Sequence, residues 1–495
     1  MLAGTGSDVG KSVVATALCR IFLQDGYHPA PFKAQNMALN SYATPDGLEI
    51  GRAQAVQAEA AGLPCHTDMN PLLLKPQSDH TSQVVLHGKA IGSRSAYDFW
   101  RDREKREAGG EEIDFRAEVC AAFDRLADRY NPIVMEGAGS ICELNLKQHD
   151  LVNMSMARHA KADVILVADI DRGGVFASAY GSIALQAPDD RRRIKGIVVN
   201  KFRGDQRLFD DGRRILEEVC QVPVLGVIPY MNDLHIEGED SVALEKRGCG
   251  ERNDGQGEQG ITVAVVRLPH ISNYTDFDML EQDSRVHLYY TDQPSELSGA
   301  DIIFLPGTKA TLSDLRWLYQ RGLAAAVLRA HREGKSIVGI CGGYQMMGYE
   351  VLDPQHVEGD DERMAGLGLL PVSTTMNGEK LTRQVTCEFG QGYEIHQGVT
   401  RPVGDARLLP LTTLSDGRIA GYRTSAKCMG TYVHGILDNA PFVDFLLQPW
   451  ADKAGSRTVA LDYRQFKEQQ YNRLADHVRQ HLNIQKLYQI LTSND

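Results

Sequence analysis

A cysteine between an apolar run and two glycines is the residue in this sequence with the clearest chemical potential. The stretch "SIVGICGGYQ" places Cys341 directly before Gly342 and Gly343. An apolar run that ends in Gly-x-Cys-x-Gly predicts a buried strand, a turn too tight for side chains, and then a helix. Such a turn presents the thiol and directs backbone N–H groups at the atom that the thiol attacks. The alternative is a structural cysteine beside a glycine-rich turn, because free cysteine is among the most buried residue types.

Two further stretches can complete a nucleophile site around this cysteine. The run "FLPGTKAT" predicts a strand that ends in a turn at Gly307, and "GTYVHGIL" places His434 after a short β-like run. We expect His434 to activate the thiol of Cys341 for attack on a carboxamide, from which ammonia leaves with a proton from the imidazole. The oxyanion would lie on backbone donors near Gly307 and Gly342. Taken alone, His434 could equally be a histidine packed in the core.

A glycine-rich loop near the first residue is a second candidate site, for phosphate. The run "AGTGSDVGKSVV" leads through Gly10, Lys11 and Ser12 into an apolar helix start. Backbone N–H groups of such a loop surround phosphate oxygens, the lysine reaches the β- and γ-phosphates, and the serine hydroxyl reaches Mg²⁺. The spacing is a variant, since Gly4 lies six positions before Gly10 and Thr5 stands where the first glycine usually does. A glycine-rich turn that only packs a helix is the alternative.

Polar residues that follow other apolar runs extend this candidate nucleotide site. Glu136 ends the run "PIVME" and is predicted, with Ser12, to hold Mg²⁺. Lys33, in "FKAQNMALNSY", can stabilise charge on a transferred phosphate. Asn200 and Lys201, in "VVNKFRGD", are candidates for recognition of the nucleotide base. Each of them can instead be a turn former, because polar residues are common where strands end.

The alternation of apolar and helical patterns predicts the scaffold that positions these residues. Buried β-rich runs alternate with amphipathic stretches up to about residue 230, and a second such pattern begins at Ile261. This alternation predicts an α/β chain with two doubly wound, mostly parallel sheets, whose sites lie at the carboxyl ends of the strands. The predicted parts are a P-loop ATP-binding domain (1–232), a charged, glycine-rich linker (233–260), a second α/β domain (261–450) and a C-terminal helical extension (451–495).

Composition narrows the class of protein and its partners. The 495 residues are too many for one core, and 42% are hydrophobic and 24% charged, as in ordinary globular proteins. The net charge of −12 argues against nucleic acid or an anionic membrane as the main partner. No apolar run approaches the length of a membrane span and no signal peptide precedes the loop, so we expect a cytoplasmic protein. The nine cysteines include no Cys-x-x-Cys pair, which suggests neither a disulfide framework nor structural zinc.

The two candidate sites resemble those of two known families. The "GTGSDVGKS" loop is similar to that of dethiobiotin synthetase-like ATPases, and "LPG", "GICGGYQ" and a late histidine resemble the class I, or triad, glutamine amidotransferase domain. In this order they resemble the corrinoid amidotransferases over essentially the whole chain. The stretches "NMALNSY", "GRAQAVQAEAAG", "MNPLLLKP", "DIDRGGVFA", "VNKFRGD" and "RLPHISNYTDFD" are similar to the cobyric acid synthase family in particular.

This resemblance implies an activity. Members of that family use ATP and L-glutamine to amidate several peripheral carboxylates of adenosylcobyrinic acid a,c-diamide, which gives adenosylcobyric acid in cobalamin biosynthesis. The resemblance implies Cys341 and His434 as catalytic residues, Mg²⁺ together with ATP, and no prosthetic group. One alternative is the related cobyrinic acid a,c-diamide synthase, which has the same domain order. Another is a P-loop switch ATPase in which a degenerate amidase lobe serves only for contacts.

The sequence departs from the triad class at one position. Those enzymes usually carry a glutamate two residues after the histidine, where it orients the imidazole, but here Ile436 stands at that position. We therefore expect a Cys–His dyad, or an orienting group from elsewhere in the chain. Glu394 and His396, in "GYEIHQG", are candidates to line the region, and neither is assigned as the orienting group.

Overall fold

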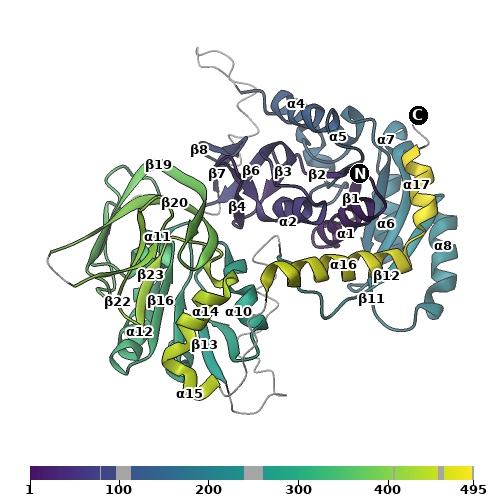
Figure 1. Ribbon diagram of the computed structural model, residues 1–495. Coiled ribbons are helices and arrows are strands. Elements are labelled where there is room, and N and C mark those ends of the chain that lie inside the picture. The colour runs from purple at the N-terminus through teal and green to yellow at the C-terminus, as the bar shows by residue number, and fades with distance from the viewer. Residues whose placement is uncertain are drawn as a thin grey trace.

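The computed structural model describes residues 1–77, 80–95, 113–238, 260–359, 361–404, 407–454 and 462–492. Two α/β parts lie beside each other, the first in purple and teal and the second mainly in green (Figure 1). The predicted α/β class with two mostly parallel sheet domains is confirmed. No helix among the described residues is long and apolar enough to cross a membrane.

The first part is built on a parallel sheet with the strand order β1–β10–β11–β12. A bridge between Leu2 and Glu136 adds β9 beside β1, and β9 pairs in parallel with β2. The strands are β1 (Leu2–Gly4), β2 (Ala30–Phe32), β9 (Ile133–Met135), β10 (Val164–Asp169), β11 (Ile194–Phe202) and β12 (Val224–Pro229). Because all of them run in one direction, their carboxyl ends meet at one edge. This edge carries the glycine-rich loop, Glu136 and Asn200.

Helices cover both faces of this sheet, as expected for buried parallel strands (Figure 1). They are α1 (Lys11–Gln24), α2 (Arg52–Ala60), α4 (Phe115–Ala127), α5 (Met154–His159), α6 (Val175–Ala184), α7 (Pro188–Arg193) and α8 (Asp210–Cys220). The helix α1 begins directly after Gly10, whose φ of 94° favours glycine. A Cβ atom at Gly10 would lie 2.0 Å from Nδ2 of Asn200, so the loop also needs a residue without a side chain there.

Two smaller β-structures extend the first part toward the second. A sheet with the order β3–β6–β7–β8 is parallel between its first two strands and antiparallel between the others. A hairpin joins β4 and β5. The strands are β3 (Gln35–Met37), β4 (Ser41–Ala43), β5 (Glu49–Gly51), β6 (Leu72–Pro76), β7 (Thr81–Leu86) and β8 (Lys89–Ser95).

The second part is built on a seven-stranded sheet with the order β14–β13–β15–β16–β23–β22–β21. The first five strands of this order are parallel, and the last two are antiparallel. The strands are β13 (Ile261–Val266), β14 (Val286–Thr291), β15 (Ile302–Leu305), β16 (Ser336–Ile340), β21 (Leu409–Thr413), β22 (Ile419–Ser425) and β23 (Cys428–Thr431). The helices are α10 (Asp278–Gln282), α11 (Thr311–Gln320), α12 (Leu323–Arg332), α13 (Gly342–Met346) and α14 (Ala440–Leu447).

A second, four-stranded sheet of this part reaches the first part. It has the order β18–β17–β19–β20, with β17 (Glu350–Leu352), β18 (Arg363–Ala365), β19 (Val372–Cys387) and β20 (Gly390–Pro402). The long β19–β20 ribbon lies against the β4–β5 hairpin. Nε2 of Gln384 donates to the carbonyl oxygen of Ala43 at 3.1 Å, and the rings of Tyr42 and Tyr393 pack edge to face at 4.7 Å. The two parts are therefore joined by specific contacts between this ribbon and this hairpin.

The C-terminal segment returns to the first part. After α15 (Ala451–Ala454), the helix α16 (Tyr463–His481) runs along α1, and α17 (Ile484–Thr492) follows (Figure 1). Arg20 and Glu468 form an ion pair at 2.5 Å between α1 and α16. The apolar face of α16 belongs to the same core as α1, through Tyr471, Leu474, Ala475 and Val478. The predicted helical extension thus completes the core of the first part.

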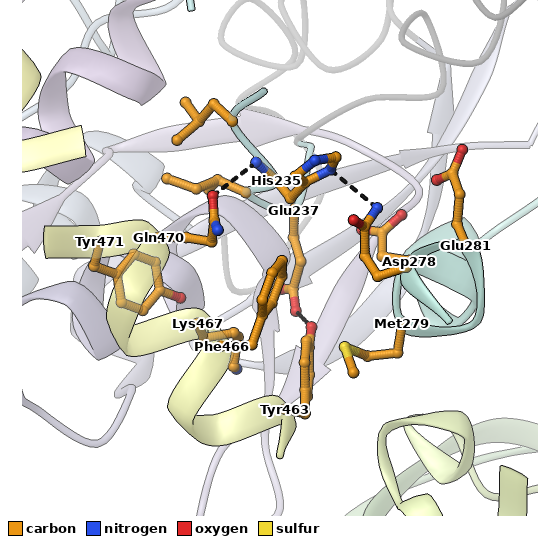
Figure 2. Close-up of a pocket in the computed structure, with 13 residues that line it drawn as sticks. His235, Glu237, Asp278, Met279, Glu281, Tyr463, Phe466, Lys467, Gln470 and Tyr471 are labelled. Carbon is orange, nitrogen blue, oxygen red and sulfur yellow. Dashed lines mark hydrogen bonds between the residues drawn. The ribbon is translucent and has the colours of Figure 1, made fainter. Parts of the chain in front are cut away.

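A pocket marks the place where the two parts and the C-terminal helix meet (Figure 2). The backbone N–H of His235 donates to Oε1 of Gln470 at 3.2 Å, and Nδ1 of His235 accepts from Nε2 of Gln282 at 3.0 Å. Glu237 contacts both Tyr463 and Arg52. These contacts anchor the start of the predicted linker. Its residues 239–259 lie outside the described part of the chain.

Candidate active site

The candidate nucleophile Cys341 stands between a strand and a helix. Its backbone lies between β16 and α13, with φ 52° and ψ −111°, which is a strained conformation for a residue other than glycine. A Cβ atom at Gly343 would lie 1.9 Å from the carbonyl oxygen of Leu305, so the chain needs glycine there to turn so tightly. Cys341 is 6% exposed, and its Sγ lies 3.5 Å from the carbonyl oxygen of Ile395.

The structure places His434 beside this thiol, together with a carboxylate that the sequence did not reveal. His434 follows β23 and is 1% exposed. Its Nδ1 lies 2.7 Å from Oδ2 of Asp276, and the other carboxylate oxygen of Asp276 accepts from the backbone N–H of Gly435 at 2.9 Å. The ring of Tyr393 stacks on the imidazole at 5.3 Å. Asp276 therefore holds one nitrogen of the imidazole and leaves the other for Cys341.

The surroundings of His434 raise the pKa of its imidazole to about 10. Burial opposes this shift, because it disfavours the charged form. The negative charge of Asp276 and the interaction with Cys341 outweigh burial. The imidazole is therefore cationic at neutral pH, and a cationic imidazole beside a thiol is the pairing that activates a cysteine nucleophile.

The other candidates to line this region are engaged elsewhere. Glu394 forms an ion pair with Arg383 at 2.5 Å. The ring of His396 stacks on Tyr432 at 3.7 Å, and burial lowers the pKa of this histidine to about 3. Ile436, at the position of the expected glutamate, is 1% exposed and packs in the core of the second part. The orienting group thus comes from a stretch 158 residues before the histidine.

The two predicted oxyanion residues lie beside Cys341 and His434. A Cβ atom at Gly307 would be 3.1 Å from Cε1 of His434, and one at Gly342 would be 2.6 Å from Cγ2 of Thr308. The turn after β15 and the start of α13 are therefore in close contact. The backbone N–H of Gly342 stands in the first turn of α13, where it has no acceptor within the helix.

A pocket opens at this thiol and is shared by both parts of the chain. The second part supplies most of its walls, and Ser41 and Lys75 belong to the first part. Its lining consists of Ser41, Lys75, Ser272, Asn273, Thr308, Lys309, Thr311, Cys341, Gln345, Glu358, Lys380, Ile395, His396, Gln397 and His434. The backbone N–H of Ser41 donates to Oδ1 of Asn273 at 3.1 Å, which ties the two parts together at the pocket.

In the first part the predicted loop connects β1 to α1. Thr5 is held by a hydrogen bond from its N–H to the carbonyl oxygen of Val167 at 3.1 Å, directly after Gly4. Nζ of Lys11 donates to the carbonyl oxygens of Gly6 and Gly139, each at 2.9 Å. The ammonium therefore lies over the loop, in the position from which it can reach phosphates bound there.

Ser12, Lys33 and Glu136 meet at the same edge. Oε1 of Glu136 accepts from Oγ of Ser12 at 2.8 Å and from Nζ of Lys33 at 2.9 Å. The other oxygen accepts from Nε2 of Gln57 at 2.6 Å, and Glu136 is 1% exposed. One hydroxyl and one carboxylate beside a phosphate loop fit Mg²⁺, which takes a few protein oxygens and completes its shell with phosphates and water.

Asn200 and Lys201 hold the loop from the opposite side. Nδ2 of Asn200 donates to the carbonyl oxygen of Val9 at 3.0 Å. Lys201 has a φ of 61°, and its ammonium lies 3.1 Å from Oδ2 of Asp169 and contacts the carbonyl oxygen of Asp8. Both residues thus lie beside the glycine-rich loop and their contacts stabilise it, while recognition of a nucleotide base by them stays a prediction.

Comparison with known families agrees with this division of the chain. Residues 1–242 match the family described as "CobQ/CobB/MinD/ParA nucleotide binding domain". Residues 262–442 match the family described as "CobB/CobQ-like glutamine amidotransferase domain". The first match contains the P-loop, and the second contains Cys341, His434 and Asp276.

Several named proteins are similar in sequence to this chain over nearly its full length. A cobyric acid synthase of Bacteroides fragilis is 64% identical over 501 residues, which cover 100% of this chain and 98% of that protein. The cobyric acid synthase of Parabacteroides distasonis is 51% identical over 99% of this chain and 97% of its own length. That of Photorhabdus laumondii is 44% identical over 100% of this chain and 98% of its own length. The chain belongs to the cobyric acid synthase family.

Proposed function

We propose that this protein uses ATP and glutamine to convert several peripheral carboxylates of adenosylcobyrinic acid a,c-diamide into amides, which gives adenosylcobyric acid. The observation that carries this proposal is the full-length similarity to cobyric acid synthases, at 64% identity to the Bacteroides fragilis protein. A buried Cys341–His434–Asp276 group and a P-loop in one chain support it, because the reaction needs both a source of ammonia and a way to activate carboxylates.

The amidotransferase part releases ammonia from glutamine. The Sγ thiolate of Cys341 attacks the carboxamide carbon of glutamine and forms the tetrahedral adduct, whose oxyanion faces backbone donors near Gly307 and Gly342. The C–N bond then breaks, and ammonia leaves with a proton from His434. Asp276 holds the imidazole in place and stabilises its positive charge. Water hydrolyses the remaining glutamyl thioester to glutamate and returns the thiol.

The nucleotide-binding part activates the corrinoid carboxylate. A carboxylate is a poor acceptor for an amine, so its oxygen first takes the γ-phosphoryl group of ATP, and ADP leaves. Lys11 and Lys33 offset the negative charge at the transferring group. Ser12 and Glu136 would hold Mg²⁺, which supplies further charge compensation on the phosphates. Ammonia then displaces phosphate from the acyl phosphate, and the amide forms.

The pocket shared by the two parts supports a coupling of the two reactions in one chain. Free ammonia is mostly protonated at neutral pH and is then no nucleophile. Ser41 and Lys75 of the synthetase part line the pocket at Cys341, which supports release of ammonia next to that part. This arrangement supports direct use of the ammonia and protects the acyl phosphate from hydrolysis.

The test is a reaction with ATP, Mg²⁺, the corrinoid diamide and glutamine that carries heavy nitrogen in its amide. We expect mass spectrometry to show products in which successive OH groups are replaced by labelled NH₂ groups, up to adenosylcobyric acid. A parallel reaction contains cobyrinic acid in place of the diamide, and amidation in that reaction alone would instead identify an a,c-diamide synthase. ATP hydrolysis without glutamine hydrolysis would overturn the proposal in favour of a switch ATPase.

A further inference from the structure

The pocket at Cys341 is lined by more charged side chains than the chemistry of the thiol requires. Besides Cys341 and His434 it is lined by three lysines, Lys75, Lys309 and Lys380, and by Glu358. The two roles already described, attack by sulfur and proton transfer by imidazole, use none of them. Their partners show which of these charges are already satisfied within the protein.

Lys75 and Lys380 are satisfied by a carboxylate of the first part. Oε1 of Glu49 lies 2.7 Å from the ammonium of Lys75, and Oε2 lies 2.5 Å from that of Lys380. Lys75 also donates to Oγ of Ser41 at 2.9 Å. Each oxygen of Glu49 thus has its own ammonium. Both lysines therefore have an ion-pair partner within the protein.

Lys309 differs from them. The residue is 8% exposed, and within the described part of the chain its ammonium forms neither a hydrogen bond nor an ion pair. The backbone of Lys309 is held by a hydrogen bond from its N–H to the carbonyl oxygen of His270 at 3.1 Å. Burial lowers the pKa of this lysine, against the attraction of Glu358. A buried ammonium without a partner is costly, so this position suits an anion that arrives with a ligand.

Glu358 is the complementary group. Its Oε2 accepts from the backbone N–H of Thr311 at 2.6 Å, and its Oε1 accepts from the hydroxyl of Thr311 at 3.3 Å. Both donors are neutral, and the described residues place no cation in ion-pair contact with it. Asp353 accepts from the backbone N–H of Glu358 at 2.8 Å, which fixes the position of the residue. Burial raises the pKa of this carboxyl to about 7, so an arriving cation would stabilise its ionised form.

We infer that Lys309 binds the α-carboxylate of glutamine and Glu358 binds its α-ammonium group, while the side-chain carboxamide lies at Cys341. Glutamine carries an anion and a cation at one end and the reacting carboxamide at the other. The pocket offers an unpaired cation, an anion with only neutral donors, and the nucleophile. This inference rests on the proposed function and adds the residues that select the amino acid.

The experiment compares three substrates in the hydrolysis of a carboxamide by the full chain with ATP and the corrinoid diamide present. They are L-glutamine, L-glutaminamide, in which the α-carboxylate is an uncharged amide, and 4-carbamoylbutanoate, which lacks the α-ammonium group. The variants are Lys309→Met and Glu358→Gln, which keep side-chain size and remove charge. The readout is the kcat/KM for glutamine divided by the kcat/KM for each analogue. A general loss of activity lowers both values equally and leaves this ratio unchanged.

We expect wild type to prefer glutamine over both analogues, because a site built to pair a charged group rejects a substrate without it. Lys309→Met should lower the preference over glutaminamide by roughly 10-fold to 100-fold and retain the preference over 4-carbamoylbutanoate. Glu358→Gln should show the reverse pattern. If Lys309→Met does not fold, Lys309→Gln gives the same readout.

Lys380→Met is the matched control, since it removes a lysine of the same pocket whose ammonium is already paired. Both preferences should stay unchanged in that variant. The inference would be overturned if Lys309→Met and Glu358→Gln kept the wild-type preference for glutamine over both analogues. It would also be overturned if Lys380→Met lost as much of this preference as Lys309→Met. Wild type that does not hydrolyse glutamine at all would instead overturn the proposed function.

Discussion

At the scale of single residues, the placement of Asp276 accounts for the charge on His434. The carboxylate reaches Nδ1 of the imidazole at 2.7 Å and the N–H of Gly435 at 2.9 Å. Asp276 therefore both orients the imidazole ring and stabilises its protonated form. A glutamate two residues after the histidine is not needed, because Asp276, in the 3-10 helix Tyr274–Phe277 after β13, already contacts Nδ1. Ile436 is free to pack in the core.

Asp276→Asn should lower the rate of glutamine hydrolysis by roughly 100-fold to 10,000-fold, because a neutral amide neither stabilises the imidazolium nor fixes its tautomer. Steady-state assays of glutamate release test this. Ile436→Ala is the control. It should lower the free energy of unfolding by about 2–5 kcal/mol through a core cavity and retain the glutaminase rate of the folded protein. A large catalytic loss in folded Ile436→Ala would contradict the role given to Asp276.

The pH dependence of His434 gives a second test. Its pKa is raised to about 10, against an ordinary value of 6.5, so the imidazole keeps its proton as the pH rises through the neutral range and loses it only near pH 10. Because the imidazole stays protonated, its titration should cause no loss of glutaminase activity between neutral pH and about pH 9. An NMR titration of the imidazole measures the midpoint. In Asp276→Asn the midpoint should be lower, and activity should fall at a lower alkaline pH.

At the scale of secondary-structure elements, both candidate sites depend on a short turn between a parallel strand and a helix. One turn joins β16 to α13 and carries Cys341, and the other joins β1 to α1 and carries Lys11. In each, glycines allow the chain to pass where a side chain would collide with the backbone or with Asn200. The strands end at the same kind of sheet edge, which is where open α/β sheets bind ligands.

Lys11→Ala tests the first turn. It removes the ammonium that lies over the P-loop, so amidation should fall by roughly 1,000-fold or more with either glutamine or ammonium as the nitrogen source. Glutamine hydrolysis at Cys341 should persist at a measurable level, since that site lies in the other part of the chain. Normal amidation with ammonium in this variant would show that the loop only packs a helix.

At the scale of the whole molecule, two domains and a returning helix form one unit. The β19–β20 ribbon contacts the β4–β5 hairpin at the amidotransferase pocket. On another side, α16 leaves the second part and completes the core around α1. The first part thus depends on residues that come after the second part in sequence, although its family match ends at residue 242.

Cys341→Ser tests the separation of the two chemistries. It should abolish amidation that depends on glutamine, because the hydroxyl is a far weaker nucleophile in a site built for a thiol. Amidation with a high concentration of ammonium at alkaline pH should continue, since in the proposed mechanism the acyl phosphate forms at the P-loop. Product formation with each nitrogen source measures both. Loss of the two activities together, in a folded variant, would mean that the sites cannot be separated or that Cys341 is structural.

Leu474→Ala tests the role of the returning helix. Leu474 is 2% exposed in the core that α16 shares with α1, so its truncation should cost about 2–5 kcal/mol of stability. Gln469→Ala, at an exposed position of the same helix, is the matched control and should change little. Thermal unfolding with and without ATP identifies the transition of the nucleotide-binding part, which should move only in Leu474→Ala. An equal shift in both variants would contradict the packing role.

Much of the site could be predicted from the sequence because its signals are local. The turn at Cys341 and the loop at Lys11 each lie within a dozen neighbouring residues, where apolar runs and glycines specify a strand, a turn and a helix. The alternation of such units predicts the two sheets, and parallel strands bring Gly307 and Gly342 to one edge. Strand–turn–helix units, which depend only on residues close together in the chain, can therefore be predicted from the sequence alone.

The tertiary structure alone decided which distant side chains meet. Asp276 stands 158 positions before His434, and no period or spacing connects an aspartate in "SNYTDFD" with that histidine. The same holds for Lys309 with Glu358 and for the return of α16 to α1. Such pairs depend on how whole sheets and ribbons pack, and that packing is set by the sum of many buried contacts rather than by any stretch that can be recognised by itself.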